Sequence, residues 1–436
     1  MTRLAKIAWL LAAAIVGTVN QGCGRLGFAP IANDAEPLSD DAADAMAANY
    51  NDFGLATNWS TFDTKSVNPG ASGFVGAAFD GRYVYFVPSY NGTLNGIVTR
   101  YDTQADFTVT AAWTTFDTTT VNTNARGFNG GVFDGRYLYL VPQENLQGAN
   151  GLVARYDTQA AFSDGAAWST FDMATVSAGA VGYYGATFDG RYIYFSPYVG
   201  VRAARYDTTL PFNQAGAWSL FNLTQLLTDV PAYPGSVFDG RYAYYVPLYN
   251  GAGGSGRVSR VDTTGNFTTA TSWLSFDTAT LAGAPKGFVG GTFDGRYLYL
   301  VPFVSGQGMA HGVVTRFDTR LAFGAAASWS TFDLSGVGPN AKAFVGGAFD
   351  GRFAYFVPAA NGEVTRYDST QPFEATAAWA IFDTATLAAD ARGFNGAVFD
   401  GRYLYLVPHS GSRVARFDSK TPRALPALPF HFGSFL

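Results

Sequence analysis

The chain has 436 residues, of which 48% are hydrophobic, 16% aromatic and 14% charged, and its formal net charge is −5. So apolar a chain buries much of itself, which excludes a largely disordered protein, and its acidic balance argues against a nucleic-acid binder, which is normally basic. The length would allow two or three ordinary domains, but a repeat array can form a single larger one.

The N-terminus, MTRLAKIAWLLAAAIVGTVNQGC, predicts a signal peptide over residues 1–22. Two basic residues precede an apolar run over residues 7–19, which is short for a membrane span. The end of this segment, NQGC, resembles the lipobox of bacterial lipoproteins: Gly22 and Cys23 match, while Asn20 stands where that family prefers Leu. The resemblance implies export, lipidation of Cys23 and a place in the cell envelope as an outer-membrane lipoprotein.

Residues 23–57 predict a lipid-anchored, flexible tether. They are rich in Asp, Ala, Pro and Ser and show no apolar periodicity. Several acyl chains on Cys23 would hold the chain firmly at a membrane, because each buried methylene contributes about 0.8 kcal/mol.

A repeated unit of 50 to 56 residues fills most of the remaining chain. The sequence FDGR begins at Phe79, Phe133, Phe188, Phe238, Phe293, Phe349 and Phe399. A period near fifty residues is typical of propeller blades, and seven copies predict seven of them.

Each unit has four stretches typical of β-strands, which in the first unit are SGFVGAAF, RYVYFVP, IVTRYDT and WTTFDTTTV. Asp80-Gly81 between the first two predicts a two-residue hairpin turn. The second strand is apolar on both faces, so both faces of its sheet must be covered. The period and the recurring Trp and Asp resemble WD-repeat and kelch propellers, without a residue-for-residue match to either. We therefore predict an all-β, seven-bladed β-propeller of four-stranded antiparallel blades over residues 58–420.

The order of strands predicts how the ring closes. The first Trp, Trp59, precedes the first inner strand, whereas no Trp follows the last unit. We expect the N-terminal strand Trp59–Asp63 to supply the outermost strand of the last blade. In the alternative, the C-terminal tail over residues 421–436 takes that edge, since its Phe432 falls where the fourth strand normally has Phe.

Most of each unit is constant in length, and the variation lies between the Pro of VP and the Arg of RYD. In an antiparallel meander this second-to-third loop opens on the same face as the connections between blades, which makes that face the candidate binding face. The long loops SYNGTLNG, QENLQGANG, LYNGAGGSG and FVSGQGMAHG have groups suited to a neutral polyhydroxy ligand, although ordinary turns use the same residues.

Two positions at the start of each inner strand vary between units. The first holds Ser72, Arg126, Val181, Pro231, Lys286, Lys342 and Arg392, and the second holds Val75, Asn129, Tyr184, Pro234, Val289, Val345 and Asn395. On the propeller these positions surround the channel mouth, where converging basic residues would attract an anion, or they are solvated turn residues. A glycine that recurs directly after the second position indicates close backbone approach at the axis. The candidate ligand-binding residues are Arg126, Asn129, Tyr184, Lys286, Lys342, Arg392 and Asn395.

The repeated Arg and Asp residues predict structural ion pairs, because such charges are seldom buried without a partner. The histidines have no metal-ligand spacing, and no GxSxG, HExxH or phosphate loop occurs, so we expect no catalytic residue, metal or cofactor. A carboxylate pair assembled by folding is left open, with Glu144 and Glu363 as its candidates.

We expect a monomeric binding module for a carbohydrate or an anionic surface polymer. One alternative is a protein-assembly scaffold with an envelope protein as partner, similar in placement to the propeller lipoprotein subunit of the outer-membrane barrel assembly machine. The other alternative is a propeller hydrolase or lyase.

Overall fold

The structure is a computed structural model and describes residues 48–305 and 307–428. The expected signal peptide, Cys23 and most of the expected tether lie outside the described residues. No helix within the described ranges is long and apolar enough to cross a membrane.

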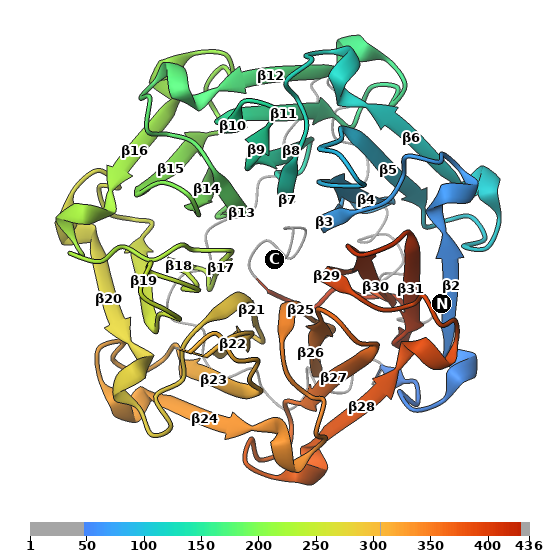
Figure 1. Ribbon diagram of the computed structural model, residues 1–436, viewed down its shortest axis with the longest axis vertical. Coiled ribbons are helices and arrows are strands. Elements are labelled where there is room, and N and C mark those ends of the chain that lie inside the picture. The colour runs from blue at the N-terminus through green and yellow to red at the C-terminus, as the bar shows by residue number, and fades with distance from the viewer. Residues whose placement is uncertain (1–47, 306, 429–436) are drawn as a thin grey trace, which may run out of the picture. The chain divides into compact units, whose positions relative to one another are not determined.

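The described residues form seven four-stranded antiparallel sheets, arranged around a central axis as the predicted propeller (Figure 1). Blade 1 consists of β3 (Phe74–Phe79), β4 (Tyr83–Pro88), β5 (Ile97–Asp102) and β6 (Trp113–Asp117). Blade 2 consists of β7 (Phe128–Phe133), β8 (Tyr137–Pro142), β11 (Leu152–Asp157) and β12 (Trp168–Asp172). Blade 3 consists of β13 (Tyr183–Phe188), β14 (Tyr192–Pro197), β15 (Arg202–Asp207) and β16 (Trp218–Asn222). Blade 4 consists of β17 (Ser236–Phe238), β18 (Tyr242–Tyr245), β19 (Arg257–Asp262) and β20 (Trp273–Asp277).

The remaining blades follow the same order from the axis outward. Blade 5 consists of β21 (Phe288–Phe293), β22 (Tyr297–Pro302), β23 (Val313–Asp318) and β24 (Trp329–Asp333). Blade 6 consists of β25 (Phe344–Phe349), β26 (Phe353–Pro358), β27 (Glu363–Asp368) and β28 (Trp379–Asp383). Blade 7 consists of β29 (Phe394–Phe399), β30 (Tyr403–Pro408), β31 (Arg413–Asp418) and β2 (Trp59–Asp63).

Short elements complete the described fold. Strand β1 (Asn49–Tyr50) pairs with β32 (Lys420–Thr421), and β9 (Glu144–Asn145) pairs with β10 (Gly148–Ala149). Three-residue 3-10 helices precede the outer strands at Ala56–Asn58, Thr110–Ala112, Gly165–Ala167, Ala215–Ala217, Ala270–Ser272, Ala326–Ser328 and Thr376–Ala378. Others follow those strands at Thr64–Ser66, Thr118–Thr120, Met173–Thr175, Leu223–Gln225, Thr278–Thr280, Leu334–Gly336 and Thr384–Thr386.

The FDGR sequence forms the turn between the two inner strands, one residue further along than predicted. Gly81 has a φ of 101° and occupies the first central position with Arg82 as the second, the arrangement typical of a type II′ turn. Asp80 closes the turn, and its carboxylate accepts hydrogen bonds from the backbone N–H groups of Arg82 and Tyr83 and from the Tyr85 hydroxyl. In this turn the Asp80 carboxylate accepts hydrogen bonds, and Gly81 is the residue with a left-handed backbone conformation.

The two arginines of each unit have separate structural roles. In blade 1, Arg82 donates two hydrogen bonds to Asp102, and the Arg82 guanidinium holds the pKa of that carboxyl below its usual range. Arg100 lies 4.2 Å from the ring centres of both Tyr83 in its own blade and Phe162 in the next. The predicted structural ion pair is confirmed for Arg82, whereas Arg100 lies between aromatic rings of neighbouring blades and so joins them.

The core lies between neighbouring sheets. One cluster packs Tyr85 and Val87 of blade 1 against Phe128 and Leu138 of blade 2, all of them buried. Because both faces of an inner strand are covered in this way, the strand is apolar on both sides.

The N-terminal strand closes the ring, as predicted. Strand β2 pairs with β31 from Trp59 opposite Phe417 to Asp63 opposite Arg413. Trp59 also stacks on Phe382 of blade 6, with ring centres 4.6 Å apart and planes at 7°. The alternative in which the C-terminal tail takes this edge is wrong, because β2 occupies it.

The packed region begins before residue 58, the expected start of the propeller. Phe53 is buried, accepts a hydrogen bond from the Trp59 indole N–H on its backbone carbonyl, and lies 4.5 Å from the Arg366 guanidinium. It therefore fills the place that Phe162 takes beside Arg100. In the C-terminal tail, Arg423 pairs with the buried Asp400 at 2.9 Å.

Candidate functional site

The glycine that recurs in each inner strand shapes the channel wall. Gly76 has a φ of 72°, and the pairing of β3 with β4 shifts by one residue between Phe74 and Ala77. The same shift occurs in six of the seven described blades, blade 4 being the exception. We predicted close backbone approach here; the structure shows a β-bulge whose left-handed residue favours Gly. A bulge re-aims the side chain beside it, which is the varying position before each glycine.

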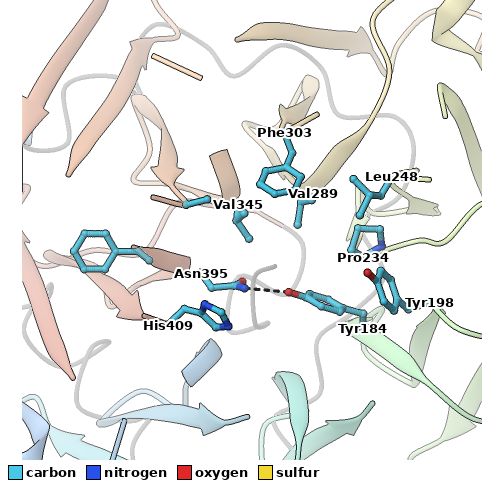
Figure 2. Close-up of a pocket in the computed structure, with 11 residues that line it drawn as sticks. Tyr184, Tyr198, Pro234, Leu248, Val289, Phe303, Val345, Asn395 and His409 are labelled. Carbon is cyan, nitrogen blue, oxygen red and sulfur yellow. Dashed lines mark hydrogen bonds between the residues drawn. The ribbon is translucent and has the colours of Figure 1, made fainter. Parts of the chain in front are cut away.

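A pocket of about 280 Å³ lies at the channel mouth, on the face of the variable loops (Figure 2). Its floor comes from the varying position before the bulge glycine, and its wall from the residue that follows the VP proline. The floor residues are Tyr184, Pro234, Val289, Val345 and Asn395; the wall residues are Tyr198, Leu248, Phe303, Ala359 and His409; Phe394 completes the lining. The described lining thus comes from blades 3 to 7.

A hydrogen bond crosses the channel at the pocket floor. The Asn395 side-chain amide of blade 7 donates to the Tyr184 hydroxyl of blade 3 over 3.0 Å (Figure 2). Burial raises the pKa of Tyr184 to about 12, so its hydroxyl stays protonated and its hydrogen remains available to another acceptor. Asn395 is only 8% exposed, and its Oδ1 has no hydrogen-bond partner among the described residues. The floor therefore contains a hydroxyl hydrogen and a buried amide oxygen that the described residues leave without a partner.

The pocket wall combines apolar and uncharged polar groups. The rings of Tyr198 and Tyr184 lie 5.1 Å apart at 47°, and Leu248 and Phe303 pack against the buried valines of the floor. His409 stands at the exposed rim, where partial burial of its ring lowers its pKa and keeps the imidazole neutral near pH 7. No Asp, Glu, Lys or Arg belongs to the described lining.

The structure separates the seven predicted ligand-binding residues into two groups. Tyr184 and Asn395 meet in the pocket. Asn129 is buried outside the lining, where it accepts a hydrogen bond from the Ser89 hydroxyl at 2.9 Å. The basic residues also lie outside the lining: Arg126 and Lys286 are partly exposed, and Lys342 and Arg392 are exposed. Their role in ligand binding stays a prediction.

Sequence reasoning did not single out the wall position, although Leu248 and Phe303 begin two of the long loops assigned to the candidate binding face. The position after the VP proline holds Ser89, Gln143, Tyr198, Leu248, Phe303, Ala359 and His409. This position, which follows a constant Pro, varies between units as much as the two varying positions at the start of each inner strand. Variation between units at this position was the signal that would have found it.

The remaining candidates for chemistry do not meet in the pocket. Glu144 belongs to β9, and Glu363 accepts a hydrogen bond from the Asn340 side chain at 2.9 Å. His311 lies in the loop of blade 5, and His431 lies outside the described residues. Within the described ranges, no group of three or more His, Cys, Asp or Glu is placed to hold a metal ion.

A comparison of the sequence with protein-family models and with curated proteins finds no match. Solved propeller structures are similar in fold. A streptogramin B lyase has a TM-score of 0.56 at 15% identity, covering 83% of this chain and 97% of that one. YCF48 bound to D1 peptide has a TM-score of 0.52 at 12% identity, covering 86% and 98%. The Cps50 (Swd1) propeller domain of Myceliophteria thermophila has a TM-score of 0.51 at 13% identity, covering 83% and 99%. These likenesses show the propeller fold, which suits a binding or interaction module.

Proposed function

We propose that this protein binds a neutral carbohydrate and that the pocket at the channel mouth takes one sugar ring. The observation that carries the proposal is the composition of the pocket: apolar side chains face uncharged donors and acceptors across one small cavity. A pyranose ring has an apolar C–H face and a rim of hydroxyl groups, so it can meet both sides at once. Ligand pockets of this kind use apolar walls for burial and a few polar groups for orientation.

The electrostatics of the pocket favour a neutral ligand over an anion. The described lining has no Lys or Arg, and the lowered pKa of His409 leaves its imidazole uncharged near pH 7. The basic residues Arg126, Lys286, Lys342 and Arg392 lie outside the lining. Of the two ligand classes expected from the sequence, the carbohydrate therefore has the better support.

Binding is also favoured over catalysis. Two solved structures of similar fold are named as lyases, a streptogramin B lyase and a virginiamycin B lyase from Staphylococcus aureus, at 15% and 13% identity. Likeness at this level concerns the fold. General acid–base chemistry usually needs paired titratable groups within reach of the ligand, and here His409 has no carboxylate beside it in the described lining.

Titration calorimetry with a panel of neutral hexoses tests the proposal. We expect Asn395→Ala to weaken binding by about five- to tenfold, the effect of losing hydrogen bonds to an uncharged ligand. Asn129→Ala is the matched control, because Asn129 occupies the same repeat position outside the pocket, and we expect it to change affinity less than about twofold. Absence of binding across the panel, or equal losses in both variants, would contradict the proposal.

We further propose that the chain is exported and attached to a membrane through Cys23. The support is the basic and apolar N-terminal run and the Gly22-Cys23 pair. Attachment there would place the sugar-binding pocket at the cell envelope.

A further inference from the structure

The pocket is lined by five of the seven blades, and most of the tyrosines outside the repeat belong to blades 3 and 4. No described lining residue comes from blade 1 or blade 2. Eight tyrosines lie outside the RY and YD positions and the position of Tyr85, and six of them belong to these two blades: Tyr183, Tyr184, Tyr198, Tyr233, Tyr245 and Tyr249. The other two are Tyr50 and Tyr90. Since a repeat protein departs from its repeat where a site is built, the ligand is expected to extend over this side of the face.

Tyr249 is the exposed member of this set. It directly follows Leu248, which lines the pocket, and 48% of the Tyr249 side chain is exposed. The Cα atoms of consecutive residues are about 3.8 Å apart, so Tyr249 begins immediately beside the pocket wall. An exposed aromatic ring on the residue next to the pocket wall offers a flat apolar face to a ligand that extends beyond the pocket.

The loop of blade 4 holds the Tyr249 ring in place before any ligand arrives. The Tyr249 hydroxyl donates to the Gly251 carbonyl at 2.7 Å, and its backbone bridges to Ala232 and Gly254. The loop closes where the Ser255 N–H donates to the Leu248 carbonyl at 2.9 Å. With its hydroxyl engaged, Tyr249 presents mainly its ring faces, and a ring already fixed loses little entropy on binding.

We propose that Tyr249 forms a second sugar subsite and that the ligand is a neutral oligosaccharide. The inference rests on the proposed function, since the first sugar ring occupies the pocket. The second ring leaves the pocket over Leu248 and stacks its C–H face on Tyr249. The pocket determines which sugar binds through hydrogen bonds, and Tyr249 adds apolar contact with the second ring.

Blade 1 provides a matched control. Tyr90 occupies the same position, two residues after the VP proline, and is 54% exposed. Its preceding residue, Ser89, is hydrogen-bonded to Asn129 and is not part of the lining. Tyr90→Ala therefore removes an equivalent exposed ring that has no pocket beside it.

The test compares affinity with ligand length in the full-length chain. Titration calorimetry uses the best-bound neutral hexose and its linear oligomers of two to four units. We expect the oligomers to bind about tenfold more tightly than the single sugar, as one well-placed aromatic contact allows. Tyr249→Ala is expected to remove that gain while leaving single-sugar affinity unchanged, and Tyr90→Ala to keep the gain.

The outcomes separate the two proposals. Single-sugar binding with no gain from length, or a gain that survives Tyr249→Ala, overturns the subsite and leaves the pocket standing. A gain lost equally in Tyr90→Ala and Tyr249→Ala also overturns it, because the effect would then not be local to blade 4. Failure of every neutral sugar to bind overturns the proposed function itself.

Discussion

Asn395 and Asn129 occupy the same repeat position, yet only one of them faces the pocket. Asn395 reaches Tyr184 across the channel, whereas Asn129 is satisfied by Ser89 of the neighbouring blade. Their difference comes from the residue that each one meets, and that residue belongs to another blade. At the residue scale, the same repeat position therefore lines the pocket in one blade and not in another, depending on which side chain of another blade it contacts.

His311, in the loop of blade 5, occupies a repeat position that holds Asn in three other blades. Its Nδ1 accepts the backbone N–H of Val313 at 3.2 Å, the bond that the Asn side chain accepts in the loops of blades 1, 2 and 6. Burial lowers the pKa of His311 below its ordinary value of 6.5. The neutral His311 ring thus accepts the hydrogen bond that Asn accepts in the other blades. A proton on Nδ1 would abolish this bond, because Nδ1 could then no longer accept from the Val313 N–H.

A pH dependence of stability follows from His311. Because its pKa is lower in the folded than in the unfolded chain, the unfolded chain binds the proton first as pH falls below about 6.5. The stabilisation is therefore present above that pH and is lost as pH falls toward the folded-state pKa. We expect His311→Asn to keep the loop and to flatten the loss of stability between about pH 7 and 5, measured by urea unfolding. The same pH slope in both proteins would show that His311 is not its source.

At the scale of elements, the interface between blades 3 and 4 differs from the other six. Ser196, Ser236 and Tyr245 are buried there, and none of their hydroxyl groups has a hydrogen-bond partner among the described residues. Tyr233 is paired with Ser259 at 2.7 Å. At the position of Ser196 the other blades have Val87, Val141, Val246, Val301, Val357 and Val407.

We expect Ser196→Val to stabilise the protein. A buried hydroxyl without a partner costs about 1–3 kcal/mol, and valine already fits this position in every other blade. The measurement is the free energy of unfolding in urea, with Val87→Ser in blade 1 as the reverse change and expected to destabilise. A loss of stability in Ser196→Val would mean that bound water satisfies these hydroxyls in solution.

Most of the fold was predictable from the sequence, because a blade is a local unit repeated seven times. The strands and closure by Trp59–Asp63 follow from spacing within the chain, and the FDGR turn was displaced by only one residue from its predicted place. The site was predicted only in part, since the bond between Tyr184 and Asn395 joins residues 211 positions apart. Repetition indicates which positions vary but not which varying side chains meet across the axis. Phe53 was missed because its segment has the composition of a tether.

At the scale of the whole molecule, the proposed anchor makes a clear prediction. Labelled palmitate is expected to be incorporated into the protein in cells and to disappear in Cys23→Ala, with the variant moving from the membrane fraction to the released fraction. The propeller itself should be unaffected, because residue 23 precedes every strand described here. A wild-type protein that takes up no label would contradict lipidation.

Closure by the N-terminal strand also sets the order in which the molecule is finished. Among the strands of the seven sheets, β2 is the first along the chain and its partner β31 is the last. Blade 7 cannot assemble until β31 has been made, after the strands of the other six blades. Until then β2 has no partner strand, although its Phe62 stacks on Trp113 of blade 1 in the finished ring. The ring therefore closes only after the strands of all seven blades have been made, so the blades formed earlier remain an open array until the pairing of β2 with β31 joins blade 7 to blade 1.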